Sequence, residues 1–172
     1  MNYPFFEDFF FNSSFESSLN QIPPDIASIY YRFLETTNPN NPQTNNYLVN
    51  EDMFKIAELL GYLSIEHNFI PQDFEKEKAK NLINEKYPEL KKIDVIQRLI
   101  DNTILNEKKI LGTFYLRFNL DPLAEYLGAE YYYKLHRTKG SLNELKEQVN
   151  ILNQDAQGFK YAFEQICNLK NN

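Results

Sequence analysis

The sequence has one cysteine, no tryptophan and only five glycines among its 172 residues. The single Cys167 excludes a disulfide framework and any zinc site built from cysteine pairs, and it is typical of a reducing compartment. On a predicted helix Cys167 falls beside Phe163 and Ile166, which favours a buried apolar role over that of a reactive thiol. The shortage of glycine fits a helical chain whose loops use asparagine and proline instead.

Long apolar runs and an excess of positive charge are also missing. No stretch approaches the roughly 20 apolar residues of a membrane span, and the first residues lack the basic start of a signal peptide. We therefore expect a cytoplasmic protein with no membrane partner. The net charge of -6 argues against a general binder of polyanions. Because 42% of the residues are apolar, the chain can still bury a core as one domain, or as one domain with an appended helical piece.

Phenylalanine is concentrated at the start of the chain, in an aromatic-rich arm over residues 1–21. Glu7 and Asp8 interrupt its apolar run, and residues 12–21 form a polar linker. Two interpretations stay open: a short arm packed on its own domain, or an exposed patch that docks on another chain, since aromatic residues anchor interfaces. The candidate docking residues of the second interpretation are Phe5, Phe6, Phe9, Phe10 and Phe11.

A helix and a polar loop make up residues 22–46. Apolar side chains recur at helical spacing behind two prolines, which predicts a helix over Pro24–Glu35. The run Thr36–Asn46 has no apolar residue and contains two more prolines. It is therefore a predicted solvated loop and the best candidate for an internal boundary.

Three predicted helices open the next unit, residues 47–120. The first begins with Asn50 as its cap, and the second is opened by Pro71. The third begins near Asp94, where Gln97 stands at the spacing of a capping box.

A predicted hairpin completes this unit. The runs Thr103–Ile110 and Thr113–Leu120 are rich in strand-forming residues, and Gly112 lies between them. Three helices followed by a two-stranded hairpin is the order of a winged helix, with the Asp94 helix in the recognition position and the hairpin as the wing.

Residues 121–172 return to helices. Asp121 offers a side-chain cap and Pro122 a preset first turn, and both follow directly on the hairpin. Ser141 and Glu144 form a capping box for the next helix, and a last helix follows. We expect a mainly α protein with a small β-hairpin: a winged-helix-like unit followed by a C-terminal helical bundle.

Few residues suggest chemistry. Asp121 and Glu125 stand one helical turn apart and could be paired carboxylates, but the positive end of the helix dipole explains acids there more simply. His67 and His136 have no third ligand at a sensible spacing, so we expect no metal site. No cofactor-binding motif is present, and we expect no cofactor and no enzyme activity.

The segment FNLDPLAEYLGAEYY, which joins the hairpin to the next helix, resembles the "F-x-L-D-P-x-A-E-Y-L-A-A" signature of cyanobacterial-type NACHT proteins, which belong to the STAND class of signalling ATPases. Weaker similarity in the same order extends over Ile22–Asn38, Ile56–Phe74 and Gln157–Leu169. In that family the signature follows the nucleotide-binding module. The matching residues are Phe118, Leu120, Asp121, Pro122, Glu125 and Tyr126.

The ATPase machinery of that class is missing from this sequence. No G-x-x-x-x-G-K-[ST] occurs, so no loop can cradle phosphates in the way that the family mechanism needs. The resemblance therefore implies a detached, non-enzymatic regulatory module that binds a protein partner, such as a separately encoded P-loop ATPase core. The arm stands where the missing core would join.

A second interpretation is a winged-helix transcriptional regulator that binds DNA. Over residues 89–101 the charges sum to zero, and in the wing Glu107 precedes Lys108 and Lys109. A recognition helix needs basic side chains for phosphates, so a nucleic-acid partner is not expected. The sequence also leaves open an enzyme of unrecognised type and a gene remnant without an independent role.

Overall fold

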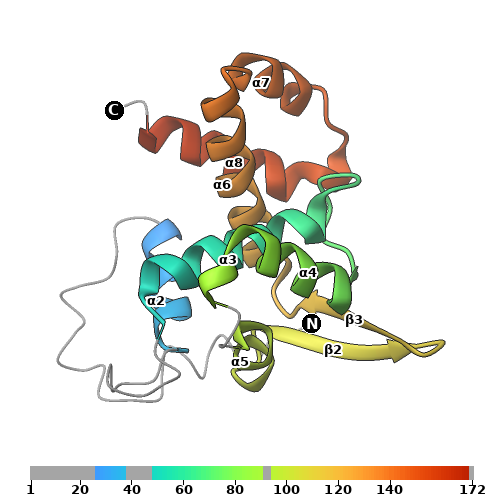
Figure 1. Cartoon of the computed structure of the whole chain (residues 1–172). Coiled ribbons are helices and arrows are strands. Elements are labelled where there is room, and N and C mark those ends of the chain that lie inside the picture. The colour runs from blue at the N-terminus through green and yellow to red at the C-terminus, as the bar shows by residue number, and fades with distance from the viewer. Residues whose placement is uncertain (1–25, 38–47, 91–93, 171–172) are drawn as a thin grey trace, which may run out of the picture.

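The computed structural model describes residues 26–37, 48–90 and 94–170, so the predicted arm and its phenylalanines lie outside the described residues. The described part is mainly helical with one small antiparallel sheet, as predicted (Figure 1). In chain order the elements are α2 (Ile26–Glu35), α3 (Asn50–Ile65), β1 (Phe74–Glu75), α4 (Lys76–Lys86), η3 (Pro88–Leu90), α5 (Val95–Asp101), β2 (Leu105–Ile110), β3 (Thr113–Phe118), α6 (Asp121–Lys139), α7 (Leu142–Asn150), η4 (Gln154–Ala156) and α8 (Gln157–Lys170).

The winged-helix-like unit runs from α3 to β3, and its sheet has the strand order β1-β3-β2. The prediction for its second helix is wrong at the start of that helix. Pro71 does not open it, because Phe74 pairs with Leu116 and Glu75 with Tyr115 as the short strand β1. Phe74 is buried in this strand and its ring lies 6.4 Å from that of Phe118. The helix α4 therefore begins only at Lys76.

The hairpin of β2 and β3 is confirmed, and it projects from the body of the molecule as the wing (Figure 1). Ile110 pairs with Thr113, so only Leu111 and Gly112 form the turn. Both have positive φ, 48° and 90°, which is the geometry of the tightest hairpin turns. Leu105, Leu116 and Phe118 at the base of the wing are buried in the core.

Helix capping by a side chain follows the prediction at one of four sites, the start of α5. The Asp94 side chain accepts from the backbone N–H of Gln97 at 2.9 Å. The Gln97 amide donates to Asp101 instead of reaching back to the cap, so only half of the predicted capping box forms.

The caps predicted for α3 and α6 are wrong, and the one predicted for α7 is right in position but makes no side-chain bond. Leu120, not Asp121, is the N-cap of α6, because the Asp121 carboxylate accepts from the Arg117 guanidinium at 3.0 and 3.2 Å. Asn50 is the first helical residue of α3 and not its cap. Ser141 is the N-cap of α7, but its hydroxyl contacts His136 Nδ1 at 2.9 Å and makes no capping hydrogen bond.

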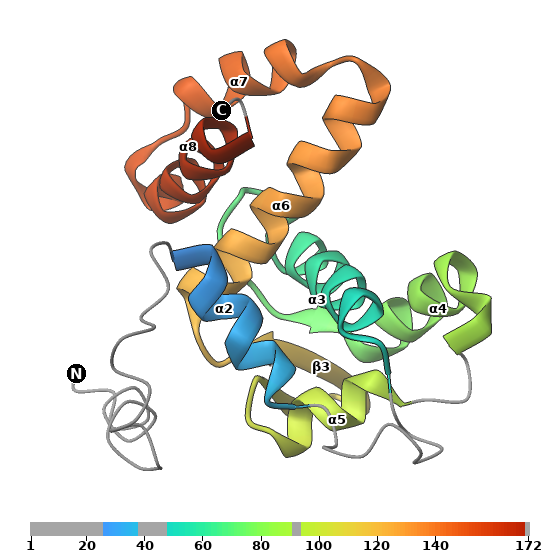
Figure 2. The ribbon, with the colours of Figure 1, turned by 90° about the vertical axis from the view of Figure 1, so that its left-hand side faces the viewer.

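The two halves of the described structure join where α3 crosses α6 (Figure 2). Gly61 and Gly128 face each other at the crossing. A Cβ on Gly61 would lie 2.6 Å from the backbone nitrogen of Gly128, and one on Gly128 would lie 2.3 Å from Ile65 Cδ1. The backbones therefore approach more closely than any larger residue allows. Helix α8 packs against α6, and α2 packs against α3. No helix in the described ranges is long and apolar enough to cross a membrane.

We predict that Gly61→Ala destabilises the protein by about 2 kcal/mol, because the new methyl group meets backbone and overpacking costs about 1–3 kcal/mol. The gain in helix propensity, about 1 kcal/mol, offsets only part of this. Thermal unfolding should show a fall in Tm of roughly 4–8 °C. Asn143→Ala on the exposed face of α7 is the control and should shift Tm little. An unchanged Tm for the Gly61 variant would contradict the close crossing.

Candidate functional site

The six signature residues lie in the connection from β3 into α6: Phe118 ends β3, and the other five belong to the LDPLAEYL block, residues 120–127. Phe118 and Tyr126 are buried in the core, and Leu120 is half-buried at the N-cap. Asp121 and Pro122 are exposed at the first turn. The block therefore couples the wing to the helix that crosses α3, and it brings no group of reactive side chains together.

Glu125 differs from the simple first-turn acid that the sequence suggests. It is half-buried, and its carboxylate lies so close to Gly158 at the start of α8 that a Cβ there would come within 2.0 Å of an oxygen. Burial raises the pKa of the Glu125 carboxyl to about 7, and the neighbouring Asp121 carboxylate contributes to this rise. Tyr30 of α2 is influenced by the same carboxyl: burial, followed by the charge of Glu125, raises the pKa of Tyr30 to about 12.

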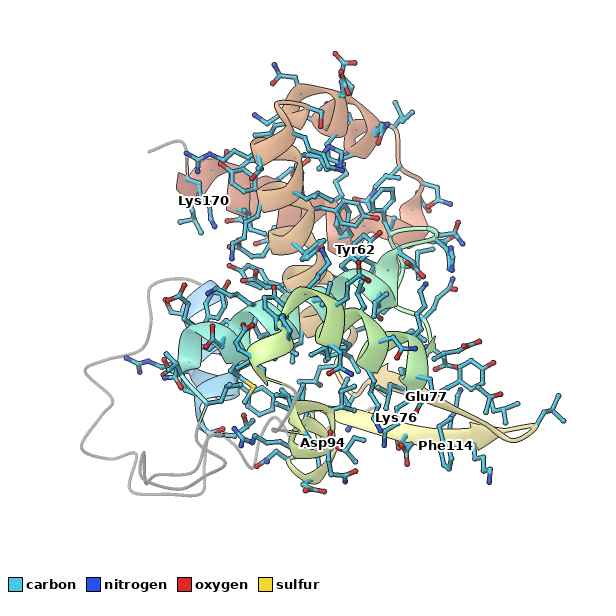
Figure 3. The ribbon with its side chains drawn as sticks, in the orientation of Figure 1. Tyr62, Lys76, Glu77, Asp94, Phe114 and Lys170 are labelled. Carbon is cyan, nitrogen blue, oxygen red and sulfur yellow. The ribbon has the colours of Figure 1, made fainter. Side chains whose placement is uncertain are left out.

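A buried ionic network joins four helices, and the sequence patterns give no sign of it. Glu58 on α3 and Glu130 on α6 are each 3% exposed. Lys134 Nζ donates to both oxygens of Glu58, at 2.6 and 2.7 Å, and lies 4.0 Å from Glu130. Lys170, near the end of α8, donates to Glu130 at 2.7 Å (Figure 3).

Two tyrosines complete this network. Tyr31 of α2 donates to Glu58 at 3.0 Å, and Tyr126 of α6 donates to Glu130 at 3.2 Å. Burial raises the pKa of the Glu58 carboxyl, and the charge of Lys134 opposes that shift. Burial also raises the pKa of Tyr31, and the negative charge of Glu58 raises it further. Each carboxylate thus has a lysine and a tyrosine, so the network fixes α2, α3, α6 and α8 to one another.

A cleft of about 680 Å³ separates the loop after α3 from the link between α7 and α8. Phe69 has a positive φ of 57°, and its ring lies 4.6 Å from that of Phe159 and 5.3 Å from that of Tyr132. The polar side chains at the cleft include His67 and Asp155, and Ile151 is 85% exposed there. The cleft is lined by His67, Asn68, Phe69, Ile70, Gln148, Ile151, Leu152, Asn153 and Asp155.

The two histidines of the sequence do not meet. His67 lies at the cleft, whereas His136 contacts Ser141 near the end of α6. Within the described ranges, no group of three or more His, Cys, Asp or Glu side chains could hold a metal ion. Cys167 is buried on α8, and burial raises the pKa of its thiol.

The tip of the wing carries three exposed apolar side chains, Ile110, Leu111 and Phe114. Phe114 pairs with Lys109 and Ile110 with Thr113, so Phe114 and Ile110 lie on opposite faces of the hairpin and Leu111 lies in the turn between them. Leu111 is fully exposed, and Ile110 and Phe114 are each more than 40% exposed. Strand β1 pairs with β3 only as far as Tyr115, so Phe114 lies beyond the sheet's third strand (Figure 3). Lys109 lies 5.0 Å from the Phe114 ring centroid and adds a positive charge to the tip.

Ion pairs hold the base of the wing. Lys76 of α4 pairs with Glu107, and Asp73, just before β1, pairs with Lys108. Glu107 and Lys108 are neighbours in a strand, so the two pairs hold opposite faces of the hairpin. The base is therefore fixed to the body, while the tip projects into solvent.

The predicted recognition helix, α5, has little to offer a phosphate backbone. Asp94 at its start and Asp101 at its end are exposed. Gln97 is occupied by its bond to Asp101 at 2.8 Å. Arg98 is half-buried, and burial lowers the pKa of its guanidinium. The exposed surface of this helix is thus mainly acidic.

No family model, no curated protein and no solved structure matches this chain. The resemblance of the LDPLAEYL block to the NACHT signature therefore stays a prediction.

Glu125 predicts a pH dependence of stability. The Glu125 carboxyl has a pKa of 4.5 in the unfolded chain and of about 7 in the folded protein. Between these two pH values the folded state therefore binds more protons than the unfolded state. Stability therefore falls as the pH rises through this window, and the loss is complete above pH 7. Glu125→Gln should raise stability at pH 8 by roughly 1 kcal/mol, allowing for solvent screening, and change it little at pH 4.5.

Thermal unfolding of the Glu125 variant across pH 4.5–8 tests this expectation. The exposed Glu147→Gln of α7 is the matched control and should follow the pH profile of the natural sequence. Parallel profiles for all three proteins would show that Glu125 is not the group responsible.

Leu111 predicts a stabilising substitution. Its φ of 48° lies in the left-handed region, which asparagine tolerates and leucine does not. Leu111→Asn should therefore raise the free energy of unfolding by about 0.5–1 kcal/mol, or Tm by roughly 1–4 °C. Leu111→Ala, which removes the apolar side chain without relieving the backbone, should leave Tm unchanged. A lower Tm for the Asn variant than for the Ala variant would contradict the turn geometry.

Proposed function

We propose that this chain is a non-enzymatic regulatory module that binds a protein partner through the tip of its wing. The observation that carries the proposal is Leu111. A leucine at the left-handed position of a tight turn costs stability, and its full exposure returns none of that cost through burial. Folding does not explain the residue, whereas binding does.

The surroundings of Leu111 support this function. Phe114 is exposed on one face of the hairpin and Ile110 on the other, and large apolar side chains at a projecting point are the usual anchors of protein interfaces. The ion pairs at Glu107 and Lys108 fix the base of the hairpin, so the tip is presented in one orientation. A partner that binds it would therefore lose little free energy in ordering the wing.

The resemblance to NACHT-type proteins suggests the partner and the regulatory role. It favours a separately encoded P-loop ATPase core in the cytoplasm, whose state the module would help to set. The LDPLAEYL block connects the wing to α6, so a force at the wing would act on the crossing of α6 with α3. The phenylalanines of the arm would supply a second contact.

Two observations favour a protein over DNA as the partner. The exposed surface of α5 carries Asp94 and Asp101, which repel phosphates. In the wing Lys108 is paired with Asp73, so this lysine is not available to a phosphate.

The buried carboxylates Glu58 and Glu130 are both neutralised by lysines, which favours a structural role over acid–base catalysis.

A pull-down from lysate of the source organism tests this function with three baits: the full chain, Leu111→Asp, and a chain lacking residues 1–20. We expect the full chain to recover a P-loop ATPase and the Leu111 variant to lose it at least tenfold. If the chain lacking residues 1–20 also fails to recover the ATPase, the arm contributes to the interface as well. The control is Tyr161→Asp, which removes an exposed aromatic side chain of α8 and should bind normally.

The two contrary outcomes are distinct. Recovery of the same proteins by the Leu111 variant would remove the wing from the interface. Salt-sensitive binding of a DNA duplex by the full chain, measured by fluorescence anisotropy, would favour the DNA-binding regulator, since phosphate contacts weaken steeply with salt.

A further inference from the structure

The cleft beside the C-terminal helices complements the wing tip in shape and in charge. Its apolar residues are Phe69, Ile70, Ile151 and Leu152, and Asp155 adds a negative charge. Among the described residues, no lysine or arginine lines it. The wing tip has the complementary composition: Leu111 in the turn, and Phe114 with the positive charge of Lys109 on one face of the hairpin. A convex apolar and basic point thus occurs on the same chain as a concave apolar and acidic cleft.

We propose that the wing tip of one copy docks into the cleft of a second copy, so that self-association and binding of the protein partner use the same surface. This inference rests on the proposed function, because it uses the same wing tip. Leu111, at the extreme of the hairpin, would enter between Phe69 and Ile151. Lys109, two residues earlier, would face Asp155 at the edge of the cleft.

The contact is between copies and not within one chain. The wing base is fixed to α4 and to the segment before β1 by the pairs of Glu107 and Lys108. In Figure 1 the wing lies at the lower right, whereas α7 lies at the top and its link to α8 runs down the right-hand side above the wing. The fixed hairpin cannot turn toward its own cleft without losing these pairs.

This arrangement has a defined symmetry. Wing and cleft are different surfaces, so each copy uses one to bind the next and offers the other to a third. Such head-to-tail contacts produce rings or open chains instead of closed two-fold dimers. A hairpin tip in an open cleft buries less surface than a stable interface needs, so the association should be weak, with a Kd of roughly 10–100 µM.

Sedimentation velocity of the full chain from about 10 to 500 µM measures the association, and two single variants assign it. Leu111→Asp disables the wing and leaves the cleft intact. Ile151→Asp disables the cleft and leaves the wing intact; both positions are exposed, so both variants should fold. We expect the natural chain to form dimers and larger species, and each variant alone to remain monomeric with at least a tenfold loss of association.

The mixture of the two variants is the decisive sample. The intact wing of the Ile151 variant can still enter the intact cleft of the Leu111 variant, so the mixture should form dimers and nothing larger. Leu111→Asn gives a second wing variant that is more stable than the natural chain and should also stay monomeric. Tyr161→Asp serves as the control and should associate normally.

Three outcomes would overturn the inference. A natural chain that stays monomeric at the highest concentration would exclude self-docking. Normal association of the Ile151 variant would show that the wing binds a surface other than the cleft, for example the wing of the second copy. A mixture that stays monomeric would exclude the wing–cleft pairing. In each of these cases, Leu111-dependent recovery of an ATPase would leave the proposed function standing, so the two failures are separable.

Discussion

The structure depends on the approach of two backbones, those of α3 and α6, at Gly61 and Gly128. Glycine at both positions lets the helices cross with main chain against main chain. This crossing brings Glu58 and Glu130 out of water on adjacent surfaces, where each carboxylate requires a cation. Lys134 comes from α6 itself, but Lys170 comes from α8, so the C-terminal bundle is fixed to the winged-helix-like unit by charge as well as by apolar packing.

The core encloses charged side chains, whereas the surface around the wing exposes apolar ones. Around the wing, most charges are in internal pairs: Lys76 with Glu107, Lys108 with Asp73, and Arg117 with Asp121. Lys109 lies over the Phe114 ring instead, and exposed apolar side chains lie at the wing tip and at the cleft. An acidic protein that pairs these charges internally is suited to recognition by shape and apolar contact, with a few charges to set the orientation.

Sequence patterns predict the long helices and the hairpin, because their apolar periods are sustained over several turns or alternations. They miss β1, since two residues show no period and the strand exists only through pairing with residues about forty positions away. They also miss Glu58 and Glu130, because an acid within a helix is taken as solvent-facing until the partner helix is placed.

Two features of the site could not be predicted from the pattern of neighbouring residues. Asp121 has the position of a cap for α6, but Arg117 is a stronger partner for a carboxylate than a backbone amide. The cleft could not be predicted, because two loops distant in sequence form it. The turn of the wing did carry a signal: a leucine precedes Gly112, where a two-residue turn prefers asparagine.

Lys170 carries a consequence for how the chain is made. During synthesis α2, α3 and most of α6 leave the ribosome well before α8, and until then Glu130 has no lysine from α8 to bind. Before α8 is in place, closing the α3–α6 crossing would bury Glu130 with Lys134 at 4.0 Å, a lysine that already donates to Glu58, and with Tyr126. Two buried carboxylates would then share one lysine, which costs more than the arrangement with two. The docking of α8 therefore completes the charge balance of a crossing formed by segments made earlier.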